Sequence, residues 1–146
     1  MMFGHIETKE DIIKNTKKVS EKYLKMKKED LIKKLKKIVG DDWVRTDDLT
    51  GYYYGSDVLT HFGQGALYPE NHPLVVVMPG STKDVQEIIK LAETNKVPIY
   101  AIGGGTVLLI GSIPGKPNVG ITFDFHRMQK ITVDKERMVV RAQPGA

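Results

Sequence analysis

Three consecutive glycines followed by a threonine form the part of this chain whose residue types best suit chemistry. The segment 98–111 reads PIYAIGGGTVLLIG and places them between a short β-type run and an apolar run. Glycine adopts backbone angles closed to other residues and has no side chain to keep a ligand away. Successive main-chain N–H groups can then point together at an anion, and a diphosphate is the obvious candidate. The alternative interpretation is a tight turn between two buried elements.

Neither of the two common nucleotide-binding motifs fits this loop. The dinucleotide fingerprint G-x-G-x-x-G fails because Leu108 stands where its third glycine belongs. The P-loop fails because Gly115 and Lys116 are followed by Pro117, which has no hydroxyl group for magnesium. What remains is a glycine loop without a magnesium ligand or a nearby lysine. Such a loop suits a diphosphate already flanked by two organic groups, and a flavin dinucleotide matches this description.

The elements that must position this loop follow a regular pattern from residue 73 onward. Short apolar runs bounded by turn residues indicate strands, and apolar residues at helical spacing after Ser81 indicate a helix to about Asn95. The predicted strands cover residues 74–78, 97–101, 120–125, 131–133 and 138–142. This order, which begins β-α-β and ends in a hairpin, predicts an α+β fold with a small mixed sheet.

The first half of the chain divides into two segments of different character. Residues 1–40 form a lysine-rich segment for which apolar spacing predicts two helices, over 8–26 and 29–39. Residues 8–38 hold twelve lysines and five acidic residues but no arginine, which favours a solvated helix face or a partner-docking surface over a nucleic-acid site. Residues 41–72 read as a polar, irregular connecting region. Its three tyrosines, Tyr52–Tyr54, suit either stacking on a ring ligand or fixing a loop against the core.

Composition excludes several classes of function. The 146 residues are enough for one domain with a core, and the absence of cysteine excludes disulfides, thiolate metal sites and cysteine nucleophiles. We predict no metal site. No apolar run approaches the ~18 residues that a membrane-spanning helix needs, and the N-terminal residues lack a secretory pattern, so we expect no transmembrane segment and a cytoplasmic location.

Taken together, six segments resemble the FAD-binding domain of the vanillyl-alcohol oxidase (PCMH-type) flavoproteins, in particular the glycolate oxidase and D-lactate dehydrogenase branch. The resemblance covers residues 29–146. The matching segments are 29–40 (EDLIKKLKKIVG), 54–57 (YGSD), 73–85 (PLVVVMPGSTKDV), 98–114 (PIYAIGGGTVLLIGSIP), 120–131 (GITFDFHRMQKI) and 139–146 (VVRAQPGA).

The resemblance implies how this chain would bind its cofactor. The family's FAD domain has two α+β subdomains with FAD between them, followed by a substrate-capping domain, and residues 73–146 resemble the first subdomain alone. The implied cofactor-binding residues are Pro79, Ile102, Gly103, Gly104, Gly105, Thr106, Val107, Gly111 and Ser112. Because no histidine lies between His72 and His126, the resemblance implies non-covalent FAD.

Two features depart from the family's usual pattern. The residue before the three glycines is often arginine in similar proteins and is Ile102 here. The positions after the threonine are often small or polar, whereas here they are the aliphatic residues 107–110. Bulky side chains there could crowd the loop, so we expect the isolated chain to bind FAD weakly or not at all.

These observations predict the N-terminal part, or a small subunit, of an FAD-dependent oxidoreductase that oxidises a 2-hydroxy acid such as lactate or glycolate, or a related alcohol. The chain reads as truncated at residues 144–146, and its last strands would need another segment to cover them. We identify no catalytic residue: His126 reads as a turn or capping residue, and His61 could act as a base only beside substrate placed by the missing part. Expected partners are the remaining half of the FAD domain, the cap domain and an electron-transfer (iron–sulfur) subunit. The alternative is a non-catalytic assembly module that docks an electron-transfer or scaffold subunit.

Overall fold

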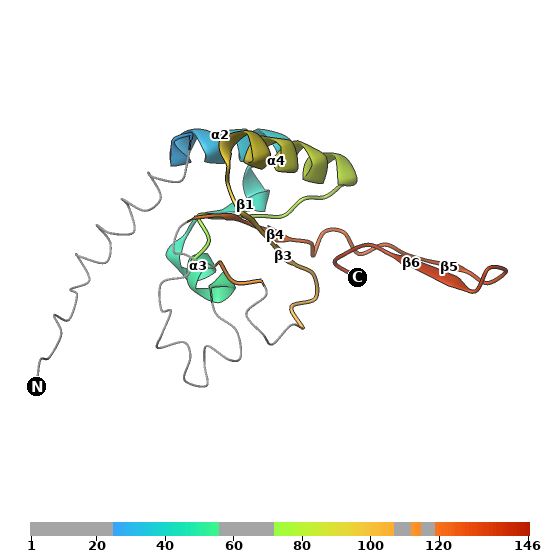
Figure 1. Ribbon diagram of the computed structural model, residues 1–146. Helices are drawn as coiled ribbons and strands as arrows, with labels where there is room; N and C mark the ends of the chain where they lie inside the picture. Colours follow the sequence, from blue (N-terminus) through green and yellow to red (C-terminus); the bar gives the residue numbers. More distant parts are fainter. Residues whose placement is uncertain (1–24, 56–71, 107–111, 115–118) are drawn as a thin grey trace, which may run out of the picture.

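The computed structural model describes residues 25–55, 72–106, 112–114 and 119–146. These residues form a four-stranded sheet with helices on both of its faces and a separate two-stranded hairpin (Figure 1). In chain order the elements are α2 (Lys28–Val39), the 3-10 helix η1 (Asp41–Trp43), β1 (Val44–Arg45), α3 (Asp48–Tyr54), β2 (Val75–Val77), α4 (Thr82–Asn95), β3 (Ile99–Ile102), β4 (Ile121–Asp124), β5 (Ile131–Asp134) and β6 (Val139–Ala142).

The strand order in the larger sheet is β1-β2-β4-β3, so the last of these strands in sequence lies between two earlier ones. β4 is parallel to both neighbours, with Ile121 opposite Val75 on one side and Ile99 on the other. β1 is antiparallel and pairs Val44 with Val77 at the outer edge of β2. The carboxyl ends of the three parallel strands therefore meet at one edge of the sheet.

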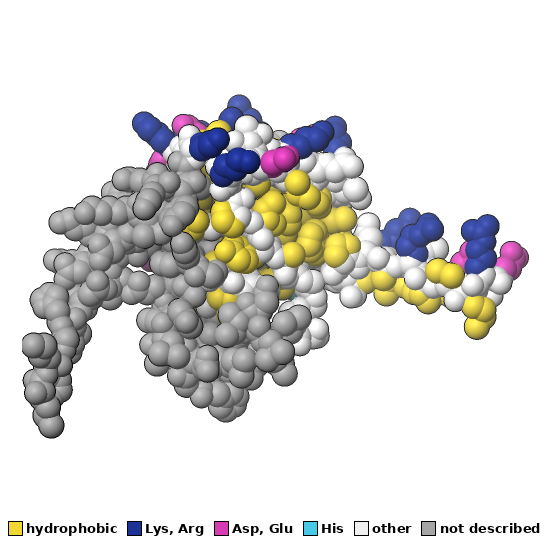
Figure 2. Space-filling model, viewed as in Figure 1, with side chains coloured by type: hydrophobic (Ala, Val, Ile, Leu, Met, Phe, Trp, Pro, Cys, Tyr) yellow, Lys and Arg dark blue, Asp and Glu magenta, His cyan; other side chains and the backbone are white. Residues whose placement is uncertain are grey.

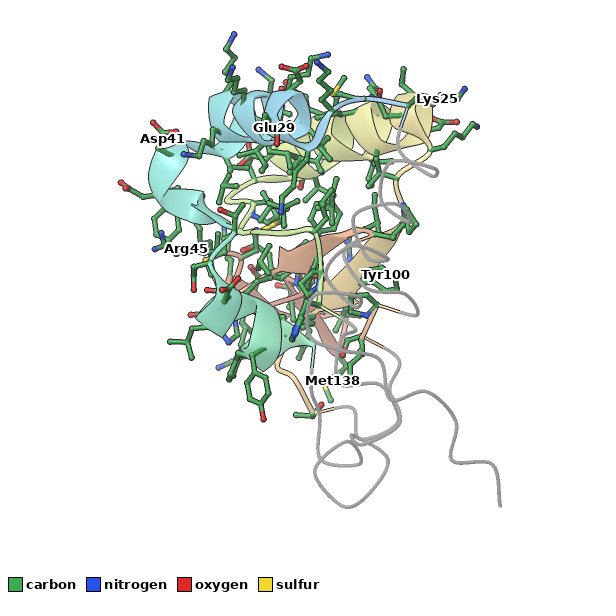
Figure 3. All side chains as sticks on the ribbon, turned by 90° about the vertical axis from the view of Figure 1, so that its left-hand side faces the viewer. Lys25, Glu29, Asp41, Arg45, Tyr100 and Met138 are labelled. Carbon is green, nitrogen blue, oxygen red and sulfur yellow. The ribbon has the colours of Figure 1, made fainter. Side chains whose placement is uncertain are left out.

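The two faces of this sheet differ because alternate residues of a strand point to opposite sides. Val75, Val77, Ile121 and Phe123 belong to one apolar core, which also contains residues of α2 and α4. The alternate residues include Thr122 and Asp124, which are buried polar side chains outside this core. Figure 3 shows α2 and α4 on one side of the sheet and α3 on the other.

Local signals explain where the two long helices begin and end. At the start of α4, the Ser81 hydroxyl group accepts from the amide of Asp84 at 3.2 Å and donates to the Asp84 carboxylate at 2.7 Å. The other oxygen of that carboxylate accepts from the Gly80 amide at 2.8 Å. α4 ends at Lys96, which takes the left-handed conformation with φ 58°. α2 has acidic residues in its first turn and lysines in its last, as the helix dipole favours, and ends at Gly40 with φ 94°.

The hairpin β5–β6 extends away from the sheet and exposes apolar side chains (Figures 1 and 2). Val133 pairs with Val140 and Ile131 with Ala142, so these four residues share one face of the ribbon. Ile131, Val133 and Val140 are each about 60% exposed, at 59%, 60% and 62%. A lone two-stranded ribbon is marginally stable in water, so this face is suited to packing against further protein.

The predicted α+β class with a small mixed sheet is confirmed, and so are the hairpin and the helix capped by Ser81. The expected helix over 29–39 corresponds to α2, while residues 8–24 of the other expected helix lie outside the described residues. The structure differs in the region that the sequence indicated to be irregular, where η1, β1 and α3 form. There Asp47 caps α3 by accepting from the Thr50 amide at 2.9 Å, and short elements of this kind have too few residues to show an apolar period.

None of the helices in the described residues is both long and apolar enough to pass through a bilayer.

Replacing Asp84 with asparagine should destabilise the chain in a pH-dependent way. Partial burial raises the pKa of this carboxyl group, but hydrogen bonds from Ser81 and Gly80 and the charge of Arg127 outweigh it and hold the pKa below its ordinary value of 3.8. The folded state therefore gains stability from Asp84 above that value and loses it as pH falls through the lowered pKa. We expect D84N to lower the free energy of unfolding by about 1 kcal/mol at pH 7.

Urea unfolding followed by circular dichroism between pH 7 and pH 2.5 measures this difference, which should shrink at the acidic end. The matched control is E87Q, which changes a carboxylate on the same helix whose partner, Lys83, lies at 3.9 Å in an exposed pair. E87Q should change stability by less than about 0.5 kcal/mol. A D84N deficit that stays constant down to pH 2.5 would show that the ionised form of the Asp84 carboxylate does not stabilise the fold.

Candidate functional site

Three loops meet at the edge where the parallel strands end. β2 leads into residues 78–80, β3 leads into the glycines, and β4 leads into the turn 125–128. Ile102 pairs with Asp124 at the ends of β3 and β4, and the Phe125 amide donates to the Ile102 carbonyl group at 3.0 Å. Ligands of sheets with parallel strands bind outside the carboxyl ends of the strands, so this edge is where a site is expected.

The glycine loop, residues 103–106, has main-chain donors that the described protein does not use. Within the described residues, no backbone hydrogen bond begins at the amide of Gly103, Gly104, Gly105 or Thr106. Gly104, Gly105 and Thr106 are also exposed. A run of neighbouring, exposed N–H groups without internal acceptors can bind an anion such as a diphosphate.

Each of the three glycines is required or permitted for a different physical reason. A Cβ atom on Gly103 would lie 2.5 Å from the Pro144 carbonyl oxygen, so this glycine allows two backbone segments to touch. Gly105 has φ +67°, in the left-handed region that favours glycine. Gly104 has neither constraint, because the nearest atom to its added Cβ would be Thr106 Cγ2 at 3.9 Å. The added Cβ of Gly105 would likewise meet nothing within 4 Å, so Gly104 and Gly105 both leave open space for a ligand, and of these two only Gly104 has no positive φ.

The neighbouring loop at residues 78–80 is held by Arg127. Its guanidinium group lies 4.0 Å from the centre of the Trp43 ring, and Nη1 donates to the Met78 carbonyl group at 2.8 Å. A Cβ atom on Gly80 would lie 2.7 Å from the same group, so glycine leaves room for Arg127. Between these contacts, Pro79 is fully buried. Pro79 is thus fixed at the sheet edge and presents little surface of its own.

A buried carboxylate joins α3 to the end of β4. Asp124, which is 2% exposed, accepts hydrogen bonds from the Tyr54 hydroxyl and from the His126 amide at 2.9 Å. His126 Nδ1 contacts the same carboxylate, while the rest of this side chain is largely exposed. A buried charge is tolerated where hydrogen bonds replace its lost hydration, and here donors from two segments do so.

This network changes the acidity of Tyr54. Burial raises the pKa of its hydroxyl group far above the ordinary value of 10.0, and the hydrogen bond to Asp124 and the charge of that carboxylate raise it further. Tyr54 therefore remains protonated and continues to donate to Asp124 well into the alkaline range. The ring of Tyr53 meets that of Tyr54 edge-on, with centroids 5.1 Å apart.

The structure brings together some of the residues that the sequence analysis singled out. Ile102, Gly103, Gly104, Gly105 and Thr106 are contiguous at the edge of the sheet, and Pro79 lies two residues after the end of β2, which is separated from β3 by β4. Ser112 is half-buried in the short described stretch 112–114, and no hydrogen bond is described between it and residues 102–106. The remaining two candidates, Val107 and Gly111, lie outside the described residues, as does His61.

Sequence reasoning missed two residues that organise this edge. Asp124 is a single acid inside the apolar run GITFDF, and a lone acid within a buried strand signals a carboxylate with designated partners. Arg127 follows in the turn, but its partners Trp43 and Met78 are far away in sequence and gave no signal. Of the tyrosines, Tyr54 is buried against the core, as one of the two interpretations expected, whereas Tyr52 and Tyr53 are exposed. Among the described residues, no group of histidine and acidic side chains could hold a metal ion.

Replacing Tyr54 with phenylalanine should reduce stability by about 1–3 kcal/mol at pH 7, because Asp124 loses a donor while remaining buried. The deficit should narrow above pH 10. There the unfolded wild-type chain releases the Tyr54 proton while the folded chain retains it, so wild-type stability falls as pH rises.

Urea unfolding from pH 7 to pH 11 measures both effects. Y53F is the matched control, because it removes a hydroxyl group from a ring that is 71% exposed. If the free energy of unfolding of Y54F runs parallel to that of the wild type up to pH 11, Tyr54 is not held in its protonated form by the fold.

Comparisons with known proteins agree with this arrangement. Residues 73–146 match the family described as "FAD binding domain". A D-lactate dehydrogenase from Anaerostipes hadrus is 35% identical over 81 residues, which is 55% of this chain and 17% of that protein. A D-2-hydroxyglutarate dehydrogenase from Stutzerimonas stutzeri is 30% identical over 115 residues, which is 79% of this chain and 23% of that protein.

The fold has counterparts among solved structures. p-Cresol methylhydroxylase with substrate bound superposes with a TM-score of 0.68 at 22% identity, over 81% of this chain and 22% of that one. The chain thus spans about a fifth of the length of these relatives. The sheet, the glycine loop and the matched residues agree with one another. The chain therefore belongs to the FAD-binding domain family of the vanillyl-alcohol oxidase (PCMH) type, and within it the chain resembles the D-lactate dehydrogenases.

Proposed function

We propose that this chain is the first part of an FAD-dependent oxidoreductase that oxidises a 2-hydroxy acid, such as lactate or glycolate, or a related alcohol. In this proposal, residues 102–107 hold the diphosphate of non-covalently bound FAD. The observation that carries it is the row of amides at Gly103–Thr106 without backbone acceptors among the described residues, the last three of them in exposed residues. The relatives named above, which act on D-lactate and D-2-hydroxyglutarate, support the substrate class.

The loop fits a diphosphate on chemical grounds. Main-chain N–H groups satisfy an anion without a neutralising lysine, provided that several of them point to the same place. The open space around Gly104 and the φ of +67° at Gly105 allow a backbone to approach a ligand closely. Ile102, where similar proteins often have arginine, would contribute through its carbonyl group, which anchors the start of the loop to Phe125.

The residues of this chain would bind and orient, and the cofactor would supply the chemistry. When bound, FAD would supply the acceptor for the hydride that leaves the alcohol carbon. Pro79 would support the cofactor from the neighbouring loop, and Gly111 and Ser112 would approach its flavin side. No described residue is proposed to be catalytic, so the groups that bind substrate and remove the hydroxyl proton would come from the rest of the enzyme.

The hairpin supplies a reason to expect that the rest of the enzyme packs here. Its exposed face of Ile131, Val133, Val140 and Ala142 needs a cover to be stable. The remaining half of the FAD domain, together with a cap domain in the same or a separate chain, would provide that cover. We also propose a cytoplasmic location, from the composition alone, and an iron–sulfur subunit as a further partner.

A second candidate function is an assembly module that docks another subunit through its basic helix. Figure 2 shows Lys and Arg side chains gathered over α2 and α4, and Lys33, Lys34 and Lys37 are exposed on α2. In that case the glycine loop would be only a turn. The two candidates differ in what a change at Gly104 should do.

Replacing Gly104 with leucine should abolish FAD retention while leaving the fold intact. The position is exposed and its added Cβ meets nothing closer than 3.9 Å, so the side chain would fill ligand space rather than protein space. We expect FAD affinity to fall more than about tenfold, that is, by more than ~1.4 kcal/mol. Flavin absorbance of the purified chain, coexpressed with a neighbouring flavoprotein reading frame, measures retention.

K34A on α2 is the matched control and should retain the wild-type amount of flavin. Circular dichroism checks that both variants are folded. Equal flavin retention by wild type and G104L would refute the diphosphate role of the loop and favour the assembly module. Tight one-to-one flavin binding by the isolated chain would instead contradict the expectation that the isolated chain binds FAD weakly.

A further inference from the structure

A closed set of backbone contacts, here called the circuit, joins the start of the glycine loop to two later segments of the chain. The Phe125 amide donates to the Ile102 carbonyl group at 3.0 Å, and the Met128 amide donates to the Phe125 carbonyl group at 2.8 Å. The Gly145 amide donates to the Met128 carbonyl group at 2.9 Å. The circuit closes where the carbonyl oxygen of Pro144 abuts Gly103. Three segments far apart in sequence therefore meet behind the first glycine of the loop.

Two glycines make this circuit possible. A Cβ atom on Gly145 would lie 1.9 Å from the Phe125 carbonyl oxygen, a distance that no real side chain allows. A Cβ atom on Gly103 would lie 2.5 Å from the Pro144 carbonyl oxygen. The backbone angles of these two positions do not themselves require glycine, since neither has a positive φ. Both are sites where one backbone must lie directly against another.

The C-terminal turn is itself fixed to the hairpin. The Gln143 amide donates to the Lys130 carbonyl group at 2.9 Å, and the Gln143 side chain accepts from the Lys130 amide at 2.9 Å. The Ala146 amide then donates to the Gln143 carbonyl group at 3.1 Å. The turn 143–146 therefore lies between the base of β5–β6 and the glycine loop, and in Figure 1 the C-terminus lies beside the base of the hairpin.

We propose that Gly103, Pro144 and Gly145 are positioning residues of the diphosphate site, and that the turn 143–146 sets the conformation of the amides at Gly104, Gly105 and Thr106. The inference rests on the proposed function and deepens it. At Gly103 the missing side chain makes room for Pro144 and not for ligand, so the open space beside the loop begins at Gly104. Because the turn also closes the hairpin, protein that packs against β5–β6 would act on the loop through these residues.

The test uses the full chain, labelled with ¹⁵N, and three variants of the circuit: G103A, G145A and P144A. P144A adds no bulk and keeps the carbonyl group but frees the backbone angle that proline fixes. The amide resonances of Gly104, Gly105 and Thr106 are compared without ligand, and then with FAD. Because we expect the isolated chain to bind FAD weakly, FAD affinity by fluorescence and the ³¹P shifts of the bound diphosphate by NMR are measured on the chain coexpressed with a neighbouring flavoprotein reading frame. Melting temperature is measured separately. K135A, at the tip of the hairpin, is the matched control.

We expect G103A and G145A to move the three amide resonances without ligand, to weaken FAD binding about tenfold or more and to shift the ³¹P signals. P144A should act in the same direction by a smaller amount, and K135A should change none of these. A purely structural role would lower the melting temperature while leaving the three amides and the ³¹P shifts unmoved, and that result overturns the proposal. If the alanine variants at the glycines do not fold, P144A alone decides by the same criteria.

Failure of the proposed function would give a different result from failure of this inference. If neither the wild type nor any variant binds FAD, with or without a coexpressed partner, while G145A still moves the resonances of Gly104–Thr106, the turn controls the loop but the ligand assignment is wrong.

Discussion

The parallel pairing of β4 between β2 and β3 is the constraint on which the other features depend. Because Ile121 faces Val75 on one side and Ile99 on the other, three chain segments separated by up to about 45 residues end at the same edge. The turn after each strand then falls beside the turns after its neighbours. The glycine loop, the Pro79 loop and the turn 125–128 owe their proximity to this register. A one-residue shift of β4 would also exchange its two faces and expose Phe123.

Asp124 shows how the central strand carries more than apolar packing. A carboxylate at this depth is tolerated because Tyr54 and the His126 amide donate to it. The same contacts hold α3 beneath the sheet, on the face opposite α2 and α4. Arg127 performs a comparable task on the other side of the turn, where it joins Trp43 to the Met78 carbonyl group. Two charged residues within four positions thus tie the N-terminal elements to the edge that the strands create.

Much of the fold could be predicted from the sequence because its signals are local. Ser81 followed by Asp84, the apolar runs around residues 75–77 and 121–124, and the turn between the last two strands all lie within a few residues of what they determine. The glycine loop was found for the same reason. The features that could not be predicted depend on residues that are far apart in the sequence. They are the position of β4 between β2 and β3, the pairing of the two-residue strand β1 with β2, and the partners of Asp124 and Arg127. The close approach of the Pro144 carbonyl oxygen to Gly103 also joins residues far apart in sequence and gave no signal.

The exposed hairpin has a consequence for handling the chain. Within the described residues, β5 and β6 pair only with each other, so each presents an outer edge of unused N–H and C=O groups beside an apolar face. Exposed strand edges of this kind pair with strands of other molecules, and in a concentrated solution those molecules are copies of the same chain. Without a natural cover, the ribbon would therefore promote concentration-dependent self-association and precipitation. A cover that buries both the face and an edge would be needed to keep the chain dispersed.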